Sequence, residues 1–132
     1  MERTRFVDHA GRRIVLMDFS NIWRVDEAAK VIEQARQFVA AQPKGKNLLT
    51  VVNVAESSFD DHVVEKLKEL ARHDEPWVLA AAVVGLRGMQ KIIFSVVNTF
   101  SRRNMATFET VAQAMAWLVT QQQPAQPQAE RR

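Results

Sequence analysis

Apolar residues in this sequence switch repeatedly between strand-like runs and helix-like stripes, and this alternation limits the fold more than any other feature. Nearly continuous apolar runs at residues 14–17, 48–54 and 77–84 predict strands that are covered on both faces. Ala106–Phe108 predicts a further, short strand. Because strands that alternate with helices pair mostly in parallel, the pattern predicts an α/β domain.

A stretch with helical periodicity follows each of these runs. The first predicted helix begins near Val25 and ends before Pro43, and the second begins behind Ser58. The third spans Met89–Arg103, and the fourth opens at Thr110. Apolar side chains recur three or four residues apart in each helix, which places a stripe on one face.

Local signals predict several boundaries of these elements. Ser58 and Asp61 resemble a capping box at the start of the second helix, with Asp in place of Glu or Gln. Thr110 with Gln113 opens the last helix in the same way. His73–Pro76 predicts a loop, because proline and the residue before it both resist the helical conformation.

Two extended segments precede the first helix. Arg5–Asp8 and Arg12–Phe19 are joined by His9–Gly11, where glycine supplies the positive φ angle of a hairpin turn. The sequence therefore predicts a mixed, mostly parallel sheet of about five strands with four helices and an N-terminal β-hairpin. We expect residues 1–120 to form one domain and the Gln/Pro-rich residues 121–132 to be disordered. The short last strand would leave a sheet edge that could pair in a homodimer.

Composition excludes several classes of function. The chain of 132 residues contains no cysteine, which excludes disulfides, thiol catalysis and cysteine-ligated zinc. No apolar run approaches the roughly 18 residues that span a bilayer. Residues 1–13 lack the apolar core of a signal peptide. We therefore expect a cytoplasmic protein without a transmembrane segment.

The net charge of +3 does not by itself indicate a nucleic-acid-binding protein. Basic residues are dispersed over the two ends of the chain and the third predicted helix, whereas residues 56–75 are net acidic. The chain has no tyrosine and no repeated aromatic–basic pattern that could stack bases. We expect no nucleic-acid partner.

Polar residues gather where the first two helix-linked strands end. Ligands of open α/β sheets bind beyond the carboxyl ends of the strands, next to helix N-termini. This position makes these residues candidates for a partner-binding or regulatory surface. The candidates are Asp18, Ser20, Asn53, Ser57, Ser58, Asp60, Asp61 and His62.

These candidates do not make a complete catalytic or metal-binding set. His62 is the only histidine predicted near the serines, and no G-x-S-x-G turn surrounds a serine. Helix capping by Ser58 and strand-end hydrogen bonding by Asp18 explain those side chains. Asp60, Asp61 and His62 point about 100° apart on a helix, so they cannot converge on one metal ion without distant ligands. We expect no catalytic residue, metal or cofactor.

A second, weaker candidate follows the third helix-linked strand. Gly85, Arg87 and Gly88 could offer backbone N–H groups and a guanidinium to an anion, with a close strand-to-helix turn as the alternative explanation. Phe94 lies off the apolar stripe of Met89–Arg103. A basic amphipathic helix of this kind could also dock on an anionic membrane or hold an apolar ligand.

The order of elements and several local strings resemble the STAS superfamily, and more narrowly its SpoIIAA-like branch. The strings are Ile14–Ser20, Asn53–Asp61, Ala81–Gly85 and Phe108–Leu118, within a resemblance that runs from about Arg5 to Val119. The resemblance implies a small cytosolic regulatory or interaction module with no catalytic turnover. The branch is also similar to lipid-carrying SEC14-type domains, so lipid or small apolar ligand binding is the alternative function.

The resemblance also implies a regulatory position. The superfamily's anti-sigma antagonists are switched by phosphorylation of a serine that follows an Asp at the start of the second helix. Alignment to that pattern puts Asp61 on the acid and His62 on the phosphoacceptor, so the switch would need Ser57 or Ser58 as a substitute. A phosphate there would add about two negative charges beside Asp60, and repulsion would release a protein partner.

Overall fold

The computed structural model of this protein describes residues 2–86 and 104–121, which form five strands and three helices. The predicted helix Met89–Arg103 and residues 122–132 of the Gln/Pro-rich tail lie outside the described residues. The elements, in chain order, are β1 (Thr4–His9), β2 (Arg12–Asp18), α1 (Val25–Ala40), β3 (Leu48–Asn53), α2 (Asp61–Asp74), β4 (Val78–Val84), β5 (Asn104–Phe108) and α4 (Val111–Leu118).

The strands form one sheet in the order β1-β2-β3-β4-β5. β1 pairs with β2 in antiparallel orientation, and each later pair is parallel. Because β2, β3 and β4 all run in the same direction, their carboxyl ends meet at one edge of the sheet. The predicted mixed, mostly parallel sheet with an N-terminal hairpin is confirmed.

The hairpin turn consists of Ala10 and Gly11, between the paired residues His9 and Arg12. Both turn residues have positive φ angles, 51° for Ala10 and 81° for Gly11. Two consecutive residues in this region are typical of a two-residue type I′ turn, whose twist matches that of the flanking strands. The predicted role of Gly11 is therefore confirmed.

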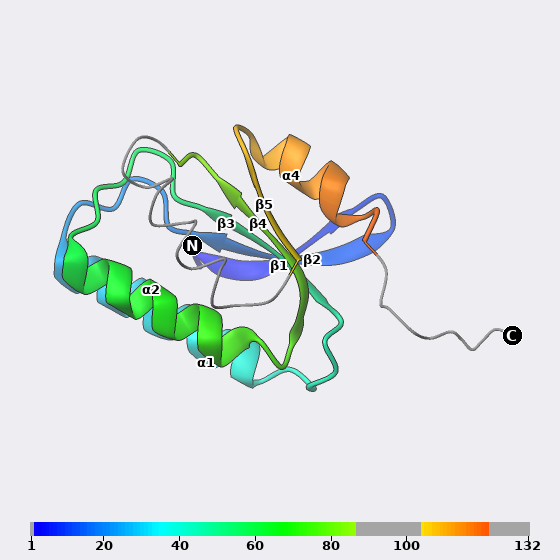
Figure 1. Cartoon of the computed structure of the whole chain (residues 1–132), viewed down its shortest axis with the longest axis horizontal. Helices are drawn as coiled ribbons and strands as arrows, with labels where there is room; N and C mark the ends of the chain where they lie inside the picture. Colours follow the sequence, from blue (N-terminus) through cyan, green and yellow to red (C-terminus); the bar gives the residue numbers. More distant parts are fainter. Residues whose placement is uncertain (1, 87–103, 122–132) are drawn as a thin grey trace, which may run out of the picture.

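Helices cover both faces of the sheet, which explains the nearly continuous apolar runs within β2, β3 and β4. α1 and α2 lie side by side on one face, and α4 lies on the other (Figure 1). In β2, Ile14 faces α4, whereas Val15 and Met17 face α1 and α2, and all three are buried. Because side chains alternate along a strand, β2 contributes residues to two separate cores.

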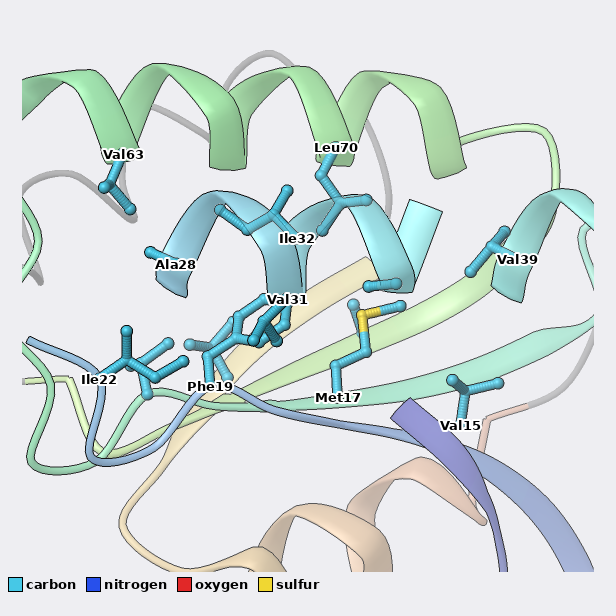
Figure 2. Close-up of a cluster of buried hydrophobic side chains, with 14 of the residues drawn as sticks. Val15, Met17, Phe19, Ile22, Ala28, Val31, Ile32, Val39, Val63 and Leu70 are labelled. Atoms are coloured by element: carbon cyan, nitrogen blue, oxygen red, sulfur yellow. The ribbon is translucent and has the colours of Figure 1, made fainter. Parts of the chain in front are cut away.

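The larger core fills the space between the sheet and the pair α1 and α2. Val63 and Leu70 of α2 point toward α1, and Val31 of α1 points toward Phe19 and Met17 (Figure 2). Phe19 is only 1% exposed although it follows the end of β2. Its burial fixes the start of the loop that leads to α1.

Two predicted boundaries of α2 are wrong. Ser58 does not cap the helix; the N-cap is Asp60, whose Oδ1 accepts a hydrogen bond of 2.9 Å from the Val63 amide. The helix also continues to Asp74, where the sequence predicts a loop. The Asp74 carboxyl is buried and bonded to His73, and this contact supports the last turn despite the approaching proline.

At the other end of the chain, the predicted capping box is confirmed. The Thr110 hydroxyl accepts a bond from the Gln113 amide, and the Gln113 side chain accepts bonds from the amides of Thr110 and Glu109. β5 begins two residues earlier than predicted, at Asn104.

Candidate functional site

The carboxyl ends of β2 and β3 lie next to each other, with Asp18 paired with Asn53 in the parallel register. The chain continues from each strand into a loop and then into α1 or α2. We call the surface formed by residues 18–27 and 53–62 the strand-end face. It contains all eight candidate residues from the first two strand ends.

Asp18 and Ser20 form one hydrogen-bonded unit at this face. The Asp18 carboxylate accepts bonds from the backbone amide and the hydroxyl of Ser20, at 3.0 and 2.5 Å. Arg3 donates to the backbone carbonyls of Asp18 and Ser20, at 3.0 and 2.9 Å, and lies 3.7 Å from the Glu27 carboxylate. The predicted strand-end hydrogen bonding by Asp18 is present. Arg3 links the segment before β1 to the start of α1.

Backbone hydrogen bonds between the two loops continue the pairing of β2 with β3. The Phe19 amide donates to the Asn53 carbonyl at 2.8 Å, and the Asn21 amide donates to the Ala55 carbonyl at 3.0 Å. The Asn53 side chain accepts from the Ala55 amide at 3.0 Å and so shapes the second loop. The loops therefore form one connected layer above the strand ends.

Ser57 completes this connection with its side chain. Its hydroxyl donates to the Phe19 carbonyl and accepts from the Ile22 amide, the latter at 3.0 Å. The Ser58 amide then donates to the Ile22 carbonyl at 3.0 Å. Because the Ser57 oxygen is occupied on both sides, a kinase could reach it only after the loops separate, whereas Ser58 is exposed.

The first turn of α2 brings Asp60, Asp61 and His62 to the same face, all of them exposed. Asp60 uses its carboxylate to cap the helix. Within the described ranges 2–86 and 104–121, no three acidic or histidine side chains are grouped closely enough to hold a metal ion. Asp61 and His62 extend the polar surface outward from the loops.

Gly85 has a structural explanation. Its backbone amide donates to the Phe108 carbonyl at 3.2 Å, so this N–H group is occupied within the sheet. Its φ angle is +89°, and a Cβ atom there would lie 2.7 Å from the Ala55 Cα. This close contact with Ala55 accounts for a glycine at position 85, while Arg87, Gly88, Phe94 and the predicted turn into the third helix lie outside the described residues.

The sequence did not predict the most conspicuous residue of this face. Trp23 is 72% exposed, and Val25, two residues later, is 41% exposed. In the described part of the chain, these two are the large apolar residues with the greatest exposure. The available signal was an aromatic residue between the end of a predicted strand and the start of a predicted helix, outside any apolar stripe.

Comparison with solved structures identifies the fold. The chain is similar to the crystal structure of an uncharacterised protein of the DUF3478 family with a SpoIIAA-like fold from Shewanella loihica. The TM-score is 0.67 at 13% sequence identity, over 87% of this chain and 91% of the other. The chain has a SpoIIAA-like fold. This confirms the predicted fold. At such low identity, the likeness shows the fold alone and not the function.

The comparisons with family models and with curated proteins add no relative to this fold. No family model matches the chain, and no curated protein matches it. Across the described part of the SpoIIAA-like domain, no helix is both long enough and apolar enough to cross a membrane.

Proposed function

We propose that this protein is a non-enzymatic regulatory module that binds a protein partner through its strand-end face. The main support is the set of hydrogen bonds that hold the two loops together as one surface. They come from backbone groups and from the Ser57 hydroxyl. A surface that is ordered before binding loses less conformational entropy when a partner docks. Asp61 and His62 project from this layer and are free of the capping role that occupies Asp60.

The polar side chains of this face support binding better than catalysis. The Asp18 carboxylate is bonded to Ser20, and the Ser57 hydroxyl is bonded to two backbone groups. The Ser20 hydroxyl donates to the Asp18 carboxylate that also accepts from the Ser20 amide, and the Ser57 hydroxyl bridges the Phe19 carbonyl and the Ile22 amide. These contacts stabilise the loops, which supports the proposal of a binding module.

A charge reversal on the proposed face tests this function. Tagged wild-type protein and Asp61→Arg would be used to capture partners from lysate, and each captured protein would be identified and purified for direct binding. Glu69→Arg is the matched control, because Glu69 is an exposed acid on the same helix, two turns away from the face. We expect Asp61→Arg to lose the partner and Glu69→Arg to keep it. Equal binding by all three proteins would contradict the proposal.

Lipid or small apolar ligand binding of the SEC14-like type is the alternative. It depends on Met89–Arg103, which lies outside the described residues, so no contact described above favours it. Native mass spectrometry of the purified protein distinguishes the two functions. A co-purifying lipid whose loss accompanies substitution of Phe94 would support the carrier, and a ligand-free protein that ignores anionic liposomes would exclude it.

A further inference from the structure

The exposure of Trp23 is unusual because the residue is also held in place. Its indole nitrogen donates a hydrogen bond of 2.6 Å to the Glu56 carbonyl, across the two loops. Burying a tryptophan removes a large apolar area from water, and an exposed one loses that stabilisation. A large aromatic side chain that is fixed by one polar contact but otherwise open to solvent is well suited to anchor a partner.

The backbone of both loops has positive φ angles close to this contact. Glu56 has a φ angle of 59° and Asn21 one of 58°, and both lie in the left-handed region. Asparagine adopts that region readily, whereas glutamate does so at a cost in conformational energy because its Cβ atom crowds the following carbonyl oxygen. Ile22, immediately before the tryptophan, is buried and bonded through both its amide and its carbonyl. These contacts present the Trp23 side chain from a rigid support.

The charge around Trp23 indicates what kind of partner it faces. The strand-end face contains six carboxylates and one arginine, a net charge of −5, in a chain whose total is +3. The arginine, Arg24, donates two bonds of 3.1 Å to Asp26. These bonds hold the pKa of Asp26 below its ordinary value. With Arg3 included, the face still carries a net charge of −4.

We propose that Trp23 anchors a basic segment of a partner protein, with Val25 as the adjacent apolar contact. An arginine or lysine of that segment stacks on the indole face, which attracts cations, while neighbouring basic residues face Asp61 and Glu56. An apolar residue of the segment covers Val25. This inference rests on the proposed function of the strand-end face and adds its anchor and the chemistry of its partner.

A library of random dodecapeptides displayed on phage tests the inference with defined probes. Peptides would be selected on the wild-type protein at low salt, synthesised, and titrated against purified variants by calorimetry. We expect the enriched peptides to carry a net positive charge together with apolar residues. Their affinity should fall as salt is raised, because the contacts on a surface of this kind are screened. Enrichment of neutral or acidic peptides, or no enrichment, would overturn the inference.

Substitutions at Trp23 separate the anchor from the rest of the face. Trp23→Ala should weaken binding about tenfold or more, as expected for a hot-spot tryptophan. Trp23→Phe keeps an aromatic face without the indole N–H group and should lose less than about threefold. Each variant must retain the wild-type unfolding midpoint. Equal affinity of wild type and Trp23→Ala would contradict the anchor.

Asp61→Arg distinguishes a failure of this inference from a failure of the proposed function. Peptides that lose affinity for Asp61→Arg but not for Trp23→Ala would refute the anchor and leave the binding face in place. Peptides that are indifferent to both would refute both. Light scattering adds one further outcome: a dimer that dissociates on Trp23→Ala would place a second copy of this chain on the tryptophan and overturn the basic partner.

Discussion

Gly85, which follows β4, lies against Ala55, which follows the end of β3. The Cβ atom of any larger residue would lie 2.7–2.8 Å from the backbone and side chain of Ala55. Such contacts are too short for carbon atoms, and the backbone of Ala55 is itself held by the hydrogen bond from Asn21. The close approach of the two strand ends therefore requires glycine at this position.

We expect Gly85→Ala to lower the free energy of unfolding by about 2–4 kcal/mol, the sum of overpacking and an unfavourable φ angle. Gly11→Ala is the matched control, because its φ angle is also positive but a Cβ atom there would meet nothing within 4 Å. That variant should lose only about 1 kcal/mol. Urea unfolding measures both, and equal losses would contradict the steric role of Ala55.

Ser57 and Ser58 are neighbours with different roles. Ser57→Ala removes the group that bridges Phe19 and Ile22, and should cost about 1–3 kcal/mol because two backbone groups lose a partner. Ser58→Ala should stay within about 0.5 kcal/mol, since its side chain is exposed. Thermal unfolding gives the comparison, and hydrogen exchange at the Ile22 amide should accelerate only in Ser57→Ala. A reversed order would refute the bridge.

Residue-scale features of this kind were only partly predictable. Asp18 was correctly expected to form hydrogen bonds at its strand end, because carboxylates that follow a buried strand commonly do so. The roles of Ser57 and Trp23 depend on contacts between loops about 35 positions apart, and periodicity within either loop carries no information about them. The same contacts explain why Ser58, whose amide is bonded to Ile22, does not cap α2.

At the scale of elements, α2 shows how the start of a helix is set. Asp60 caps the helix through the Val63 amide, so Asp60→Ala should cost about 1 kcal/mol. Asp61→Ala, one position later, removes only a favourable charge near the helix dipole and should cost about 0.5 kcal/mol. Denaturant unfolding of both variants and of Ser58→Ala tests the assignment. A larger loss in Ser58→Ala than in Asp60→Ala would restore the cap predicted from the sequence.

The hairpin and the last helix are joined by Arg12. Its guanidinium donates to the carbonyls of Val119 and Gln121, at 3.1 and 2.6 Å, just beyond the end of α4. Arg12→Met should cost about 1–3 kcal/mol, because carbonyls at a helix end lose a charged donor. Amide exchange in the last turn of α4 should also accelerate. Arg13→Met, which removes an exposed cation over Phe6, should leave that exchange unchanged.

The pattern of elements was more predictable than their ends. Apolar runs indicated the covered strands because α1 and α2 on one face and α4 on the other demand apolar residues on both sides (Figure 1). The last two residues of α2 were missed, because Pro76 signals a break but the helix continues to Asp74, whose buried carboxyl is bonded to His73. The burial of Asp74 depends on the folded chain, and a local signal such as Pro76 does not report it.

At the scale of the whole molecule, charge is distributed unevenly. The strand-end face is acidic, whereas Lys44, Lys46 and Arg72 are exposed near the opposite end of the sheet. An uneven field of this kind orients an oppositely charged partner before contact and raises its association rate. The acidic end is the one that presents Trp23.

This charge reverses the effect expected of a phosphate at Ser58. If the partner is basic, added negative charge strengthens its binding instead of releasing it. Ser58→Glu should therefore bind the selected basic peptides about twofold tighter at low salt, and Ser58→Gln should bind them as the wild type does. Calorimetry at two salt concentrations measures this, and weaker binding by Ser58→Glu would favour release by repulsion.

Binding of a protein partner by the strand-end face can be measured directly. The most direct measurement is the affinity of one purified, captured partner for the wild type, Asp61→Arg and Glu69→Arg, all with equal unfolding midpoints. Binding through this face predicts at least a tenfold loss for Asp61→Arg, about 1.4 kcal/mol, and no change for Glu69→Arg. Unchanged affinity in Asp61→Arg, or an equal loss in Glu69→Arg, would contradict it.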